Sequence, residues 1–174
     1  MSIAYEDIKQ ANDAIRTTNI KGKEYAEVNQ RIKAFRMVYP TATIETEILS
    51  IENGMCIFKA TVRDGSNILG TGHAYEKEGS SFINETSHIE NCETSAVGRA
   101  LGMAGFGIDT SVASAEEVQN AMTRKASSKQ VNILGKVYKG ENLTKLLEAN
   151  GISRLEDISA QKASDLISKL QNRQ

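Results

Sequence analysis

The chain is poor in the residues that most often carry chemistry. Its 174 residues include no tryptophan, one proline, two cysteines and two histidines. Two cysteines are too few for a disulfide framework, and both lie in apolar patterns, so we expect reduced thiols in an intracellular protein. No apolar run approaches the roughly 18 residues that span a membrane. The first residues have neither the basic start nor the apolar centre of a signal peptide, which predicts a cytoplasmic chain without a membrane segment.

These shortages exclude several kinds of active site. His88 and Cys92 lie four residues apart, but a zinc site would need further ligands. The glycine-rich stretch 102–107 lacks the lysine and the serine or threonine of a nucleotide-binding loop. We therefore predict no cofactor, no metal and no enzymatic activity. The acidic residues between Glu76 and Glu93 leave a magnesium-dependent nuclease open as an alternative.

Charge is unevenly distributed although the net charge is only −1. Residues 16–36 carry six basic and two acidic side chains, which gives +4. Residues 37–122 carry four basic and twelve acidic side chains, which gives −8, and residues 123–174 carry ten and five, which gives +5. Such asymmetry is compatible with a polyanionic partner or with head-to-tail self-association of basic and acidic surfaces.

The hydrophobic periodicity predicts an α+β fold. A three-stranded, or larger, antiparallel meander packs against helices, and a small helical module follows it. We expect helices over residues 5–16 and 25–39, and strands over 43–50, 55–63 and 67–76.

The most distinctive segment is a predicted helix of very small residues over 89–104. At 100° per residue it has an apolar face made of Ile89, Cys92, Ala96, Ala100, Met103 and Ala104. A second, nearly flat strip contains Ser95, Gly98 and Gly102. Glycine inside a helix costs about 1 kcal/mol relative to alanine, so the two glycines indicate close approach of another backbone. That backbone is a packed segment, a second subunit or a bound phosphate chain.

The end of the chain reads as a separate helical module. A helix capped at Ser114 runs to about Lys125, and a boundary falls near residues 125–128. We assign residues 1–122 to the core, 123–128 to a linker and 129–174 to the tail. Short helices are expected in the tail over 128–138, 143–150 and 159–170, with glycines 140 and 151 as stops.

Basic side chains are the candidate contacts for a polyanion. Lys21 and Lys23 lie in a loop before the second helix, on which Arg31, Lys33 and Arg36 flank the apolar stripe. Lys59 and Arg63 share one face of a predicted strand. Arg99 either contacts phosphate through the glycine strip or pairs with an acidic neighbour, and we favour the pairing. Because only nine residues are aromatic, we expect the phosphate backbone to be bound and the bases to face outward.

The sequence resembles the phage single-strand annealing proteins of the ERF and Sak type, which are related to the Rad-fifty-two annealing fold. The residues that carry the resemblance are Gly22–Val28, Arg31–Arg36, Gly72–Ala74, Glu93–Gly102 and Ala113–Val118. It spans roughly Tyr25 to Val118. The acidic middle segment departs from a uniformly basic groove and concentrates the expected contacts on the cations named above.

The resemblance implies pairing of complementary single-stranded DNA without ATP, as a homo-oligomeric ring or filament in the cytoplasm of a bacterial host. Residues 128–130 and 163–167 resemble the helical tails of some phage recombination proteins. Such a tail implies a protein partner, for example a single-strand binding protein or an exonuclease. The alternatives are a passive single-strand binding protein of the replication machinery, the nuclease, and an interaction protein that binds no nucleic acid.

Overall fold

The structure is a computed structural model that describes residues 3–109 and 111–171. The chain forms two compact units: Met1–Gly79 with Ile83–Gln119, and Ser80–Phe82 with Asn120–Gln174. In the described part of the chain, no helix is long and apolar enough to cross a membrane.

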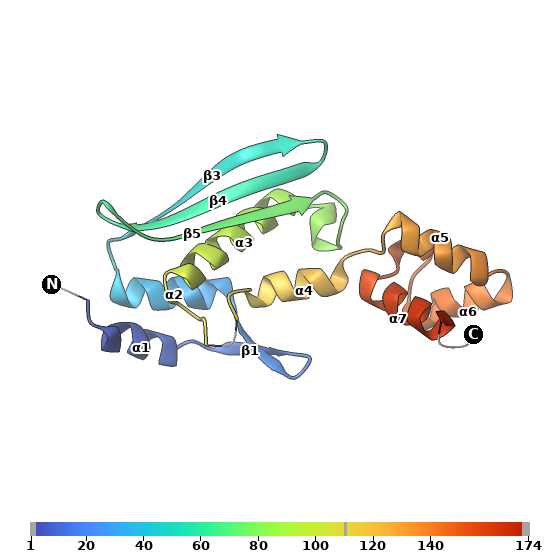
Figure 1. Cartoon of the computed structure of the whole chain (residues 1–174), viewed down its shortest axis with the longest axis horizontal. Helices are drawn as coiled ribbons and strands as arrows, with labels where there is room; N and C mark the ends of the chain where they lie inside the picture. Colours follow the sequence, from blue (N-terminus) through green and yellow to red (C-terminus); the bar gives the residue numbers. More distant parts are fainter. Residues whose placement is uncertain (1–2, 110, 172–174) are drawn as a thin grey trace. The chain divides into compact units, whose positions relative to one another are not determined.

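The first unit is built on a three-stranded antiparallel sheet in the order β3 (Thr43–Glu52), β4 (Met55–Asp64), β5 (Asn67–Lys77). Helix α3 (His88–Met103) packs on β4 and β5, α2 (Val28–Val38) packs on α3, and α1 (Tyr5–Asp13) packs on α2. All three helices lie on the same side of the sheet (Figure 1). This arrangement confirms the predicted α+β fold with a meander packed against helices.

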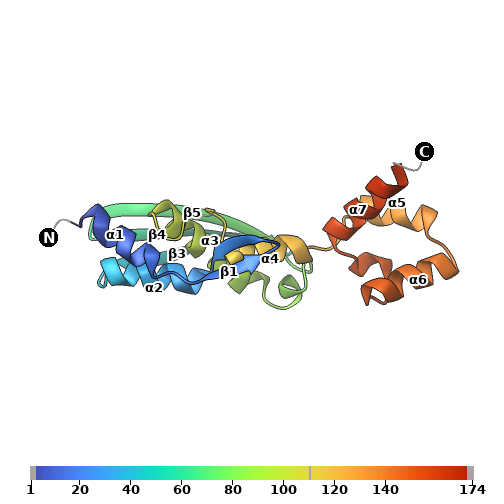
Figure 2. The same cartoon turned by 90° about the horizontal axis from the view of Figure 1, so that it is seen from below.

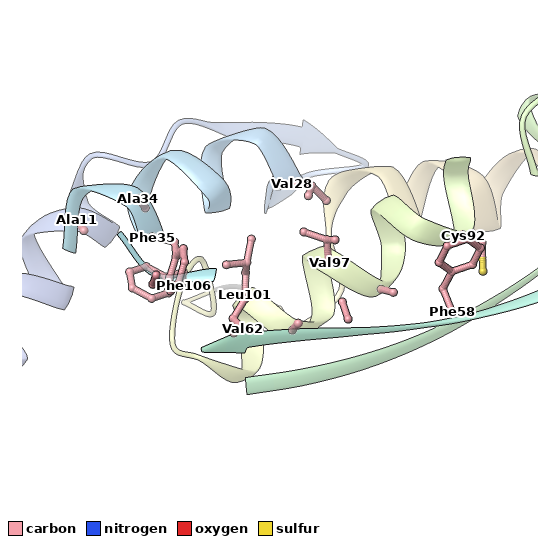
Figure 3. Packing of buried hydrophobic residues seen from close by; sticks show 14 of the residues in the cluster. Ala11, Val28, Ala34, Phe35, Phe58, Val62, Cys92, Val97, Leu101 and Phe106 are labelled. Carbon is pink, nitrogen blue, oxygen red and sulfur yellow. The ribbon is translucent and has the colours of Figure 1, made fainter. Parts of the chain in front are cut away.

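The alternation along β4 places its small and apolar residues in the core. Cys56, Phe58, Ala60 and Val62 are buried, whereas Lys59 on the opposite face is half-exposed. Figure 3 shows the same core continuing through α3 to the aromatic rings of α2 and the segment after α3. Phe35 and Phe106 meet edge to face there, with ring centroids 5.4 Å apart.

Two glycines of β5 allow the strand to lie directly on α3. A Cβ atom on Gly70 would lie 2.4 Å from the Ala100 carbonyl oxygen, and one on Gly72 would lie 2.4 Å from the Ala96 carbonyl oxygen. Both neighbours are backbone atoms, so they cannot move aside cheaply. Gly70 and Gly72 therefore permit a close approach of the strand to the helix backbone of the same chain.

Helix α3 follows its predicted apolar face with one exception. Cys92, Ala96, Ala100 and Leu101 are fully buried. Met103 is 64% exposed, so its assignment to the buried face is wrong. The helix ends at Met103, and the backbone of this last turn lies against Gly70 of β5 while the Met103 side chain is exposed.

The sequence analysis missed a hairpin before α2. Strands β1 (Thr17–Ile20) and β2 (Lys23–Ala26) pair antiparallel through a two-residue turn. Both turn residues have positive φ, 51° at Lys21 and 81° at Gly22, as in the turns that match the twist of a hairpin. Four-residue polar strands have too little alternation to be recognised from sequence, so the sequence pattern predicts a loop and the start of a helix here.

The second unit is helical and has its own core. Helix α4 (Ala115–Thr123) leads into it and is followed by α5 (Ser128–Val137), α6 (Glu141–Asn150) and α7 (Ala160–Gln171) (Figure 2). A short 3-10 helix, Leu155–Asp157, precedes α7, and another, Ile83–Glu85, lies in the first unit. Leu134, Leu146, Leu155, Ile158 and Ala163 form the buried cluster. Gly151 caps α6 in the left-handed conformation, as its position in the sequence predicts.

The contact between β5 and α3 gives a test of the fold. Gly72→Ala would force a methyl group against helix backbone, so we expect the free energy of unfolding to fall by about 1–3 kcal/mol. Thr71→Ala, on the exposed face of the same strand, should change it by less than about 1 kcal/mol. Urea denaturation followed by circular dichroism measures both. Equal stability of the two variants would contradict the close approach.

Candidate nucleic-acid interface

The cations proposed from the sequence have three different environments in the structure. Four are exposed and form no ion pair with any residue in the described ranges: Lys21, Lys23, Lys33 and Arg36. Three are paired with glutamates, and one is buried. Only the first group has a charge that is available to a polyanion without displacing an existing carboxylate.

The free cations come from the β1–β2 hairpin and from α2, which follow each other in the chain. Lys21 is at the turn of the hairpin and Lys23 begins β2. Lys33 and Arg36 share the exposed side of α2 with Asn29, as the helical spacing predicts. Arg36 is partly engaged, because its Nη1 donates to the Ala42 carbonyl and its guanidinium lies 5.6 Å from the centre of the Phe35 ring. Arg16, just before β1, is a further exposed cation that the sequence analysis did not select.

The cations of β4 are matched by acids of β3. Lys59 Nζ lies 3.8 Å from Glu47 Oε2, and Arg63 Nε lies 3.2 Å from Glu45 Oε2. The antiparallel register places Lys59 directly opposite Glu47. Exposed pairs of this kind contribute little stability, but they cancel the positive field that a phosphate chain would require.

Arg99 forms the ion pair favoured in the sequence analysis. Its Nε donates to Glu117 Oε1 at 2.7 Å. The other oxygen of Glu117 accepts the backbone N–H of Ser114 at 3.0 Å, while Ser114 Oγ accepts the N–H of Glu117 at 3.3 Å. Glu117 thus completes the predicted cap of α4 and neutralises Arg99 at the same time.

Arg31 requires a correction. Its place beside the apolar stripe of α2 predicts a contact with a polyanion, whereas its side chain is fully buried. Nη1 donates to the carbonyl oxygens of Gly98 at 2.7 Å and Val112 at 2.8 Å. Nη2 donates to the carbonyls of Gly107, Ser111 and Ala113 at 2.8–3.2 Å. Arg31 therefore joins α2 to α3 and to the segment after α3, and cannot reach a phosphate.

Burial lowers the pKa of the Arg31 guanidinium, and the nearby carboxylates of Glu117 and Glu116 partly offset this effect. Arginine retains its proton in proteins, so the lowered pKa reflects the cost of holding a charge away from water. The five carbonyl acceptors offset that cost. Nε has no hydrogen-bond partner among the described residues.

The glycine strip of α3 is also inside the unit. Ser95, Gly98 and Gly102 are buried. A Cβ on Gly98 would meet Val28 Cγ2 at 2.8 Å, and one on Gly102 would meet Arg31 Nη1 at 2.8 Å. The strip is explained by the approach of α2 within the same chain, and it leaves no surface for a phosphate or a second subunit.

The residues considered for covalent chemistry do not gather into a site. No group of three or more His, Cys, Asp or Glu that could hold a metal ion occurs among the described residues. Glu76 accepts a hydrogen bond from Asn84 at 2.6 Å, and Glu93 accepts one from Thr46 at 2.6 Å. Cys92 is fully buried, and burial together with the neighbouring Cys56 raises the pKa of its thiol to about 12.

Comparison with known proteins finds a similarity to a family over part of the chain. Residues 32–104 match the family described as "Slr1353 N-terminal dsRNA-binding domain-like". These residues contain most of α2, the whole sheet and α3, together with Lys33 and Arg36. No curated protein and no solved structure matches the chain.

The Arg31 network gives a test of the packing around this surface. Arg31→Met leaves several buried carbonyls without a donor, each costing about 1–3 kcal/mol. We therefore expect the free energy of unfolding to fall by at least about 3 kcal/mol. Arg31→Lys should recover only part of the loss, because an ammonium group lacks the planar fork of the guanidinium. Lys33→Met, exposed on the same helix, is the control, with a change within about 0.5 kcal/mol. Urea denaturation separates these outcomes, and a stable Arg31→Met protein would contradict the network's role.

Proposed function

We propose that the protein binds single-stranded DNA through the phosphate backbone and anneals complementary strands without ATP. The observation that carries the proposal is the group of exposed, unpaired cations on the β1–β2 hairpin and α2: Lys21, Lys23, Lys33 and Arg36. Phosphate contacts by such side chains supply affinity that is independent of base sequence.

The family match supports nucleic-acid binding in general. It covers α2 from residue 32 onward and the three-stranded sheet, so Lys33 and Arg36 fall within the matched residues. The annealing step and its use in phage recombination rest on the sequence resemblance to ERF and Sak proteins. The same match favours duplex RNA as a second candidate ligand, because the family is described as dsRNA-binding-domain-like.

The distribution of aromatic rings supports contact with phosphates in preference to bases. Phe35, Phe58 and Phe106 are buried in the core. The strongly exposed rings in the described ranges are Tyr5, Tyr75 and Phe82, none of which lies on the hairpin or on α2. A strand held on this surface by its phosphates would keep its bases free to meet a complement, as annealing requires.

An annealing assay tests the proposal directly. Two complementary dye-labelled oligonucleotides are mixed with the protein in the absence of ATP, with and without magnesium, and with duplex RNA as competitor. We expect faster pairing without nucleotide. Binding without acceleration would indicate a passive single-strand binding protein, and strand cleavage only with magnesium would indicate a nuclease. Preferential capture by duplex RNA would favour the second candidate, and no binding at low salt would contradict nucleic-acid binding.

A double substitution on α2 tests the binding surface. Lys33→Ala/Arg36→Ala removes two proposed phosphate contacts, so the plot of log affinity against log salt should become less steep by about 1.4, at roughly 0.7 per single-strand phosphate. Lys33→Arg/Arg36→Lys keeps both charges and should keep the slope. Fluorescence anisotropy with a labelled oligonucleotide measures the slope, and an unchanged value for the alanine variant would remove α2 from the interface.

A further inference from the structure

A groove between α2 and α3 adjoins the cation surface and shares Asn29 with it, but neither Lys33 nor Arg36 lines it. It has a volume of about 360 Å³ and is lined by Val28, Asn29, Ile32, Glu93, Thr94, Val97 and Glu116. Its walls are two helical rows of residues four apart, Val28 with Ile32 and Glu93 with Val97. Rows with this spacing form the grooves into which the side-chain ridge of another helix packs.

The charges on the lining of this groove are all negative. Glu93 accepts a hydrogen bond from Thr46 at 2.6 Å, and Glu116 accepts the backbone N–H of Val28 at 3.0 Å. Neither carboxylate forms an ion pair within the part of the chain that the structure describes. An apolar groove with two carboxylates that form no ion pair, and with no basic side chain in its lining, favours a ligand that is both apolar and cationic, and it disfavours a phosphate chain.

Helix α5 of the second unit has a surface with these properties. Leu134 lies on its buried side, whereas Ile133 (36% exposed) and Val137 (51% exposed) are neighbours on a flank of the helix, about 100° and 60° around the axis from Leu134. Lys129 and Lys136 lie on the same exposed side at helical spacing. Residues 127–140 contain three lysines and no acidic residue, and no ion pair involves these lysines in the described ranges.

We propose that α5 of one copy of this chain docks into the α2–α3 groove of a second copy. Ile133 and Val137 are separated by one helical turn, about 6 Å along the axis, and would enter the groove as a ridge. Lys129 and Lys136 would then face Glu93 and Glu116. The occupant is identified by charge complementarity, since residues 127–140 carry three lysines and no acidic residue, whereas the groove is lined by two glutamates and no basic residue.

The two docking surfaces differ, so the contact is head-to-tail and leaves one groove and one α5 unused in every pair. Such heterologous contacts build closed rings or open filaments. The contact uses neither Lys33 nor Arg36, so it does not depend on the proposed nucleic-acid function. Its failure and the failure of that function can therefore be distinguished.

Light scattering of the full chain without nucleic acid provides the first test. We expect a mass above the 19.0 kDa of one chain, falling as salt rises because the contact is partly electrostatic. Lys129→Glu/Lys136→Glu should return the mass to that of a monomer. The matched control Lys145→Glu/Lys162→Glu makes the same charge change on α6 and α7 and should leave the mass unchanged. A monomeric wild-type protein, or an equal loss of mass in the control, would overturn the proposal.

A mixing experiment tests the direction of the contact. Ile133→Ser/Val137→Ser removes the ridge, and Thr94→Arg blocks the groove, so each variant alone should be monomeric. Mixed together, the intact α5 of the Thr94→Arg chain can enter the intact groove of the other variant. We expect complexes of two chains, twice 19.0 kDa, and no larger species. A mixture that stays monomeric would contradict the contact, with circular dichroism confirming that both variants are folded. Oligonucleotide binding lost by Lys129→Glu/Lys136→Glu while its mass is retained would assign α5 to nucleic acid instead.

Discussion

The first unit depends on a single buried cation. Arg31 enters the interior from α2 and donates to five backbone carbonyls, one in α3 and four in residues 107–113. A buried charge is tolerated only when its hydrogen-bonding groups are satisfied. The segment after α3 therefore takes a path that turns its carbonyl oxygens toward the guanidinium. Gly102 and Gly107 leave room for that group, because a Cβ on either would lie within 3.1 Å of Arg31 atoms.

Helix α2 carries one buried cation with a structural role, Arg31, and two exposed cations that are available for binding, Lys33 and Arg36. Lys33 and Arg36 lie on the opposite side of α2 and remain exposed. The paired cations of β4 and α3 are neutralised by glutamates at 2.7–3.8 Å. What remains for a polyanion are the exposed cations of α2 and the adjoining hairpin, Lys21, Lys23, Lys33 and Arg36, so a core unit with an acidic net charge still presents unpaired basic side chains.

The elements that could be predicted from the sequence are those whose periodicity is strong. The alternation of β4 and the small residues of α3 indicated the meander and its covering helix. The burial of Arg31 could not be predicted from a sequence pattern, because its hydrogen-bond partners are backbone carbonyls, which every sequence contains. An acidic partner at helical or cross-strand spacing would have been visible. The pairing of Arg63 with Glu45 likewise depends on a strand register that includes a bulge near Ile48.

The glycine contact between β5 and α3 also aligns the two-residue period of the strand with the turn of the helix. Gly70 faces Ala100 and Ala104, and Gly72 faces Ala96 and Ala100. Two residues along a strand advance about 6.6 Å, and four residues along a helix advance about 6 Å, so the two periods nearly coincide where the elements touch. The helix therefore fixes the register of the strand. A shift of one residue in β5 would place a side chain against Ala96, Ala100 and Ala104 and push the sheet and the helix apart.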